Sequence, residues 1–480
     1  MFEFLLLLNF VVWLGLTLYF LRQPCASAFH PAAFYLTFHF LVFVFRPIFV
    51  WYGEYDQIYK LYQFTPSNDA RFIVEISSML GLICFVLASI YKGNATPRFP
   101  QDRVHAAERS EMIRPFLFVA AILVPAGLVM ILSNWNVRAN DATSMVFDAA
   151  TGHTINTTNN GYIENIQLFL APLTVILVWL YRFRWWTFIP LIGFVMLRAG
   201  TGGRWPFVMA CLSVGLLFLY EKRGRWPGLR PMALGSIGLM IFSMVGADRG
   251  ATIRRLFIDD KSYQGTYGGE ELRFMEGMDF ANFEFFEYLA YAVPQRTGTY
   301  GYFLDNLQIF TQPIPRVLWE GKPIGPPIQL FSLFDYGYPV GMTYSLPGNG
   351  WMQLGYLGVI IWCTLFGLLF GHVYNLFQRS EHNNPAVLAY LIFLPLSVQF
   401  FRDGLLLTLI QTTAFFLLPV WLIVRFAKLS AVPLADELRL QAYRKVIRRR
   451  PDVAAKILAR KGKGAGMGRS RLPRQNWPAE

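Results

Sequence analysis

Charged residues are scarce in this 480-residue sequence. They make up 15% of it, whereas an average soluble domain has roughly 25%. Apolar residues make up 54% of the chain. They gather into stretches close to the roughly 20 residues that a helix needs to cross the hydrocarbon of a membrane. The sequence therefore predicts an all-α polytopic membrane protein and not a soluble globular enzyme.

Cysteine and histidine are also rare. Three of the four cysteines, Cys84, Cys211 and Cys363, lie in hydrophobic runs, and Cys25 lies in a short linker, so no disulfide framework is visible. The six histidines are scattered without metal-ligand spacing. The chain has no P-loop, no Rossmann glycine fingerprint and no HExxH motif. We therefore expect no metal and no cofactor.

The net charge of +13 comes mainly from short loops beside hydrophobic runs and from the C-terminal tail. These are the places where Lys and Arg orient a membrane protein. We therefore interpret the positive charge as a topology signal and expect no nucleic-acid partner.

Eleven apolar runs are expected to span the membrane, and several are short enough to need support from neighbouring helices. The first run lacks a basic leader and a small-residue cleavage site, so we expect it to remain as the first span. The expected spans are 2–21, 31–50, 72–91, 115–133, 163–181, 185–198, 205–220, 231–247, 351–373, 386–400 and 404–424.

Lys and Arg are concentrated in segments 92–114 and 221–230 and in the tail, which places these on the cytoplasmic side. The N-terminus is then periplasmic. The expected outer segments are 51–71, 134–162, 248–350 and 401–403. The predicted organisation is transmembrane helices 1 to 8 in 1–247, a large outer loop in 248–350, helices 9 to 11 in 351–424, and a basic, partly disordered tail in 425–480.

Within the large outer loop, segment 280–295 mixes aromatic residues with Glu284 and Glu287. It fits an amphipathic helix on the membrane surface or a half-buried partner helix equally well. Prolines between 313 and 327 then predict a rigid, extended path. Such a path can hold Arg316 and Lys322 toward a ligand, or it can be a stiff connector whose cations meet lipid phosphates.

Two further arginines lie at the outer ends of expected spans. Arg204 follows three glycines within residues 200–203, which fits either close approach to a ligand or a tight turn with an arginine reaching the interface. Arg402 lies with Asp403 between two spans, where an ionisable residue is usually functional, although a simple ion pair is the alternative. The other external cations are Arg249, Arg254, Arg255 and Arg296. Together these groups match the charge of a pyrophosphate leaving group.

Four segments resemble motifs of the Wzy-type O-antigen and oligosaccharide repeat-unit polymerases of bacterial inner membranes. They are GTGGRWPF (200–207), PIPRVLWEGKP (313–323), PGNGWMQLGYLGVI (347–360) and FRDG (401–404). By architecture the resemblance covers roughly residues 110–425.

The resemblance implies a GT-C-like, metal-independent glycosyltransferase. It would join undecaprenyl-pyrophosphate-linked repeat units at the periplasmic face, with membrane lipids and a Wzz-type chain-length regulator as partners. Arg204, Arg316, Lys322 and Arg402 match motif positions, and the other cations are added from topology. We expect the catalytic residues to be Arg204, Arg316, Arg402 and Arg249, and the substrate-binding residues to be Arg254, Arg255, Arg296 and Lys322. A general base, if one is used, would be a carboxylate such as Asp248, Asp305 or Glu320.

Two other functions compete with this one. An O-antigen ligase has the same architecture but is expected to use a histidine in its large outer loop, and segment 248–350 contains none. A flippase or other transporter would need polar residues through the centre of the bundle and usually internal repeats, and no repeat is evident.

Overall fold

The computed structural model describes residues 2–99, 103–137, 145–148, 153–156, 161–200, 205–229, 276–314, 325–337, 341–380 and 382–430, with a few single residues between and beyond them. In this part of the chain, seven helical stretches are long and apolar enough to cross a membrane. Three shorter apolar helices accompany them: Asn165–Leu180, Trp185–Leu197 and Trp205–Glu221. This is the architecture of an α-helical membrane protein.

The helices coincide with ten of the eleven expected spans, and the remaining one, 231–247, lies almost entirely outside the described residues. The count of eleven membrane crossings stays a prediction, because three of the helices are shorter than a bilayer requires. The long elements are α1 (Phe2–Leu21), α2 (Pro31–His39) with the π-helix η1 (Phe40–Phe45) and α3 (Arg46–Tyr52), α5 (Asn68–Lys92), α7 (Ile113–Val137), η3 (Gly161–Phe169) with α9 (Leu170–Leu180), α10 (Phe188–Gly200), α11 (Trp205–Glu221), α16 (Leu346–Arg379), α17 (Asn384–Asp403) and α18 (Leu406–Leu429).

Short elements connect these helices. They are α4 (Gln57–Tyr62), α6 (Arg103–Glu111), α14 (Asn282–Ala292), α15 (Gln308–Thr311) and the 3-10 turns η4 (Trp185–Thr187), η5 (Met278–Phe280), η6 (Leu304–Leu307) and η7 (Leu333–Asp335). One antiparallel hairpin, β1 (Met145–Asp148) with β2 (His153–Asn156), departs from the all-helical expectation, and its register pairs Met145 with Asn156.

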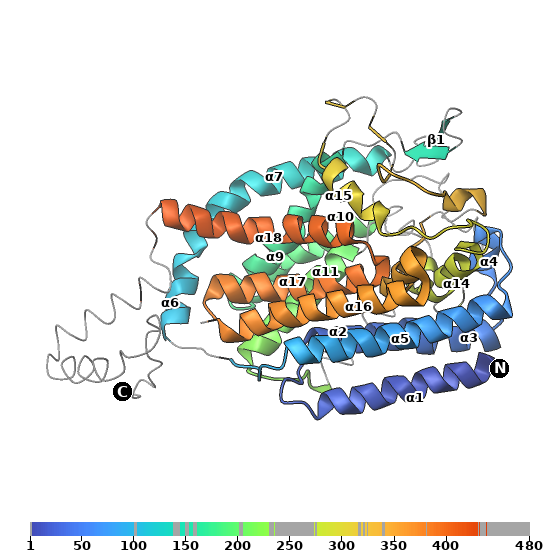
Figure 1. Cartoon of the computed structure of the whole chain (residues 1–480). Coiled ribbons are helices and arrows are strands. Elements are labelled where there is room, and N and C mark those ends of the chain that lie inside the picture. The colour runs from blue at the N-terminus through green and yellow to red at the C-terminus, as the bar shows by residue number, and fades with distance from the viewer. Residues whose placement is uncertain are drawn as a thin grey trace, which may run out of the picture.

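The long helices lie along a common axis and alternate in direction (Figure 1). α3, α4, α14 and the hairpin lie toward the end of the bundle where α1 begins, which we call the loop end. α6 and the end of α18 lie at the opposite end. α4, α14 and the hairpin belong to segments that are expected outside the membrane, and they lie toward the same end of the bundle.

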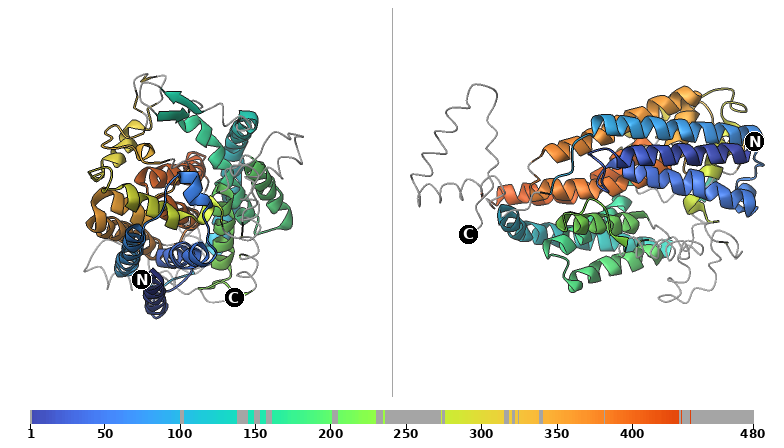
Figure 2. Two further views of the ribbon diagram at one scale, coloured as in Figure 1. Left: turned by 90° about the vertical axis from the view of Figure 1, so that its right-hand side faces the viewer. Right: turned by 90° about the horizontal axis from the view of Figure 1, so that it is seen from below.

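α5 lies at the centre of the packing, with its longest contact along α16 and further contacts with α1, α2 and α14. The close approach of α5 and α16 depends on small residues, because a Cβ at Gly371 would lie 2.4 Å from the carbonyl oxygen of Ser89. α17 contacts both α2 and α11, and α18 contacts α7 and α9, so these two helices join the N-terminal helices to the middle of the chain (Figure 2).

Candidate functional site

α14 is a buried helix at the loop end. Ten of its eleven residues are buried, and it packs against α5, α16 and η1. Of the two alternatives for segment 280–295, the surface helix is therefore wrong, and the partner helix is buried on all sides.

The two glutamates of α14 are buried because each has a basic partner. Glu284 pairs with Arg46 of α3, whose Nε donates to Oε1 at 3.0 Å and whose Nη2 also reaches the carbonyl oxygen of Glu276. Glu287 accepts hydrogen bonds from Arg71 Nε at 3.0 Å and from the Tyr59 hydroxyl. A carboxylate without such partners would be strongly unfavourable at these positions.

The two partners of Glu287 do not fully offset the effect of burial on its carboxyl. Burial raises the pKa of its carboxyl to about 7, against the opposing effects of Arg71 and the Tyr59 hydroxyl. These pairs connect α14 to α3 and α5 and hold it in place.

α16 is broken near its start. Leu354 and Gly355 have non-helical dihedral angles, with φ of +60° at Gly355. As a result the preceding turns fold back on the following ones: a Cβ at Gly350 would lie 2.7 Å from the Cα of Val359. Residues 346–353 thus form a separate short helix, which we call the 346–353 helix. Its first turn is capped by the Ser345 hydroxyl, which accepts a hydrogen bond from the Gly348 amide.

The last turn of α17 brings Arg402 to this helix. α17 ends because Gly404 adopts φ of +71°, a conformation that favours glycine. The carbonyl oxygen of Arg402 accepts hydrogen bonds from the Ser345 amide and from Asn282 Nδ2 of α14, both at 2.8 Å. The backbone at Arg402 is therefore fixed to the starts of both α14 and the 346–353 helix.

The side chain of Arg402 forms no hydrogen bond with the described residues. Burial raises the pKa of the neighbouring Asp403 carboxyl, and the positive charge of Arg402 opposes this shift. Arg402 and Asp403, both described, form no salt bridge with each other, and Asp403 instead accepts a hydrogen bond from Gln399 at 2.8 Å. Arg402 Nε and Asn282 Oδ1 are buried atoms without a hydrogen-bond partner among the described residues. Buried polar atoms are normally paired, so these are positions where a ligand or water is expected.

Asp305 lies at the other end of the 346–353 helix. Gln353 Nε2 donates to Asp305 Oδ2 at 2.9 Å and to Asn349 Oδ1 at 3.3 Å, and Asn306 Nδ2 donates to Asp305 Oδ1 at 3.1 Å. Burial raises the pKa of Asp305 to about 6, although the hydrogen bonds from Asn306, Gln353 and Asn349 oppose the shift. Near neutral pH this carboxylate is ionised and close to its pKa, which suits a general base.

Two other predicted residues are described. Lys322 is largely buried, and its Nζ donates to the carbonyl oxygens of Gln312 and Ile314 at 3.1 and 2.9 Å. Arg296 is exposed just beyond α14, with its guanidinium 3.9 Å from the centre of the Tyr291 ring. The structure therefore shows a role for Lys322 within its own loop, and the substrate-binding roles of both residues remain predictions.

The remaining predicted residues lie outside the described part of the chain. They are Arg204, Arg249, Arg254, Arg255 and Arg316, together with the alternative bases Asp248 and Glu320. Among the described residues, no group of three or more His, Cys, Asp or Glu side chains could hold a metal ion.

Sequence reasoning did not identify Asn282, Asn349 or Gln353 as individual residues. Asn349 and Gln353 lie in segment 347–360, which was identified only as a whole, by its resemblance to a motif of the polymerase family. Asn349 and Gln353 are four residues apart, the spacing that places two side chains on one face of a helix.

No family model matches the chain, and comparisons with curated proteins and with solved structures find no match to it.

Proposed function

We propose that the chain is a repeat-unit polymerase of the bacterial inner membrane, with its N-terminus in the periplasm and its C-terminus in the cytoplasm. It joins oligosaccharide units linked to undecaprenyl pyrophosphate into O-antigen or a related surface polysaccharide. The loop end would then face the periplasm. A chain-length regulator and the surrounding lipids are its expected partners.

One observation carries the proposal: a single short helix holds two groups that glycosyl transfer would use. The 346–353 helix binds the backbone of Arg402 at its start and the carboxylate of Asp305 near its end. One group offers positive charge to a leaving pyrophosphate, and the other offers a carboxylate to an acceptor hydroxyl. Hydrogen bonds to one short helix restrict the relative positions of the Arg402 backbone and the Asp305 carboxylate, and fixed positions favour a reaction between bound groups.

The proposed reaction needs a carboxylate that accepts a proton and cations that stabilise the leaving pyrophosphate. The anomeric C–O bond to the lipid pyrophosphate breaks, and its electron pair leaves with the pyrophosphate. The acceptor oxygen forms the new bond to the anomeric carbon, and its proton moves to the Asp305 carboxylate. Arg402, with Arg204 and Arg316, stabilises the charge that develops on the pyrophosphate. Arg249 belongs to the same proposed group, and Arg254, Arg255, Arg296 and Lys322 are proposed to bind the substrate.

A lipid-linked oligosaccharide flippase is the second candidate, because one observation favours it. Glu75 of α5 is fully buried and accepts a hydrogen bond from Asn9 of α1 at 2.7 Å, and Asn9 Oδ1 lies 2.8 Å from His39 Nε2 of α2. Ionisable residues within spans commonly mark transport pathways. We favour the polymerase because Arg402 provides a positive charge for the leaving group and Asp305 provides a carboxylate for the acceptor hydroxyl.

The test is reconstitution of the purified protein in liposomes with lipid-linked repeat units. A polymerase produces a ladder of longer oligosaccharides, with no added nucleotide and in the presence of a metal chelator. A flippase moves the units across the bilayer without lengthening them, and a ligase lengthens nothing until a separate lipid acceptor is supplied. Translocation without a ladder would reject the polymerase and support the flippase.

A further inference from the structure

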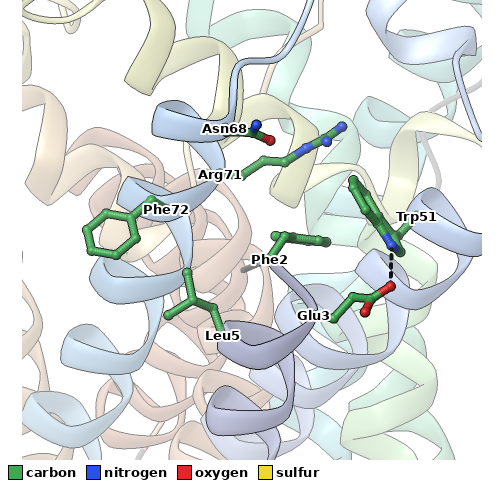
Figure 3. Close-up of a pocket in the computed structure, with 7 residues that line it drawn as sticks. All are labelled: Phe2, Glu3, Leu5, Trp51, Asn68, Arg71 and Phe72. Atoms are coloured by element: carbon green, nitrogen blue, oxygen red, sulfur yellow. Dashed lines mark hydrogen bonds between the residues drawn. The ribbon is translucent and has the colours of Figure 1, made fainter.

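A pocket of about 360 Å³ opens at the loop end, beside α14 (Figure 3). The start of α1, the end of α3 and the start of α5 form its walls. Its lining includes Phe2, Glu3, Trp51, Arg71 and Phe72.

The pocket contains the cation of Arg71, whose outer nitrogens have no hydrogen-bond partner among the described residues. Arg71 uses Nε to bind Glu287, and its guanidinium lies 4.8 Å from the Trp51 ring centre and 5.5 Å from that of Phe2. Its two η nitrogens form no hydrogen bond with the described residues, although the side chain is only 17% exposed. Two adjacent N–H groups of this kind match the oxygens of a phosphate.

The same pocket contains an anion that is not paired with this cation. Glu3 is exposed, and the Trp51 indole N–H donates to its Oε1 at 3.2 Å. Glu3 and Arg71, both described, form no salt bridge with each other. Two opposite charges that are held apart by an aromatic residue fit a ligand that carries both charges itself.

Apolar side chains next to the pocket face outward. Phe4 and Leu7 of α1 are 66% and 60% exposed, and Phe72 of α5 is 40% exposed. On a membrane-spanning helix such side chains are covered by lipid chains. Phe72 also lines the pocket, so an exposed apolar side chain lies directly beside its charges.

We propose that this pocket binds a phospholipid with a primary amine in its head group. The phosphate binds the η nitrogens of Arg71, the ammonium binds Glu3, and the acyl chains lie against Phe4, Leu7 and Phe72. A carboxylate acceptor favours a primary ammonium, which donates hydrogen bonds, over a quaternary one, which cannot. The bound lipid would also help to hold α14 in place, because its phosphate fixes Arg71 and Arg71 binds Glu287 of that helix. Asn282 lies about 140° around the same helix and binds the carbonyl oxygen of Arg402.

The first experiment uses the purified, delipidated full chain in detergent. Its thermal unfolding is followed with phosphatidylethanolamine, phosphatidylcholine and phosphatidylglycerol of the same acyl chains, and with soluble phosphoethanolamine. Phosphatidylethanolamine should stabilise the protein at about fivefold lower concentration than the other two lipids, as expected for one exposed ion pair. Equal stabilisation by phosphatidylglycerol would overturn the role of Glu3, and equal stabilisation by soluble phosphoethanolamine would overturn the assignment to a lipid.

The second experiment compares two exposed acids at the same end. Glu3→Gln should remove the preference for phosphatidylethanolamine over phosphatidylglycerol while leaving the fold intact, because Glu3 bonds only the Trp51 indole among the described residues. Asp56→Asn changes an acid that is 52% exposed and paired with Lys60, and it should keep the preference. An unchanged preference in Glu3→Gln would refute the proposal.

Discussion

Removing Arg46 should destabilise the protein far more than removing an exposed basic residue. Arg46 and Glu284 are 0% and 1% exposed, so Arg46→Met leaves a carboxylate buried without its cation. Such a change typically reduces stability by about 3 to 5 kcal/mol. Replacing both partners, as in Arg46→Met with Glu284→Leu, removes the unpaired charge and should restore much of that loss.

The assay is the temperature at which the detergent-solubilised protein loses its monodisperse peak in size-exclusion chromatography. Lys60→Met is the matched control, because Lys60 is 65% exposed in its pair with Asp56, and an exposed pair contributes about 0 to 1 kcal/mol. If Arg46→Met is no more harmful than Lys60→Met, the buried pair does not hold α14. If the double variant is no better than Arg46→Met, the unpaired charge is not the cause of the loss.

Three further outcomes follow from the same geometry. Asp305→Asn should reduce polymer formation about 10²- to 10⁴-fold, the usual contribution of a general base. Because the base must be ionised and burial raises the pKa of Asp305 to about 6, the wild-type rate should fall as the pH drops through 6, and a flat profile would exclude this role. Three charge-conserving variants, Arg402→Lys, Arg204→Lys and Arg316→Lys, should each lose about 3 kcal/mol of transition-state stabilisation. At normal membrane levels of the protein, this loss should appear as shortened or absent gel ladders. Normal ladders from all three variants would mean that these arginines only anchor the topology. Gly404→Ala should reduce the folded yield, because its Cβ would lie 2.1 Å from the Ser345 carbonyl oxygen and its φ of +71° is unfavourable for alanine, so a normal yield would count against the tight turn.

Hydrophobic runs were sufficient to predict the described long helices. The expected span 72–91 is α5 (Asn68–Lys92), and 386–400 is α17 (Asn384–Asp403). These two helices begin a few residues before the apolar runs, because the polar caps Ser67 and Asn383 begin them.

The burial of α14 could not be predicted from its own sequence. Glu284 and Glu287 on an aromatic helix fit a surface helix as well as a buried one. What decides between them is the pairing with Arg46 and Arg71, which lie more than 200 residues earlier in the chain. Periodicity within a segment carries no information about such distant partners.

The candidate site was predictable only in part. Arg402 was identified from its position between two spans, and Asp305 was one of three alternative carboxylates. Their connection through the 346–353 helix depends on the break at Leu354 and Gly355. Glycine at one position of a long apolar run is common in membrane helices, so it did not distinguish a break from a continuous helix.

The proposed glycosyl transfer is tested most directly by measuring the undecaprenyl pyrophosphate that the reconstituted protein releases while it joins lipid-linked repeat units. The chemistry predicts one released lipid pyrophosphate for each new glycosidic bond, without added nucleotide and in the presence of chelator, and strongly reduced release by Arg402→Lys. Translocated repeat units with neither released pyrophosphate nor new bonds would contradict a polymerase.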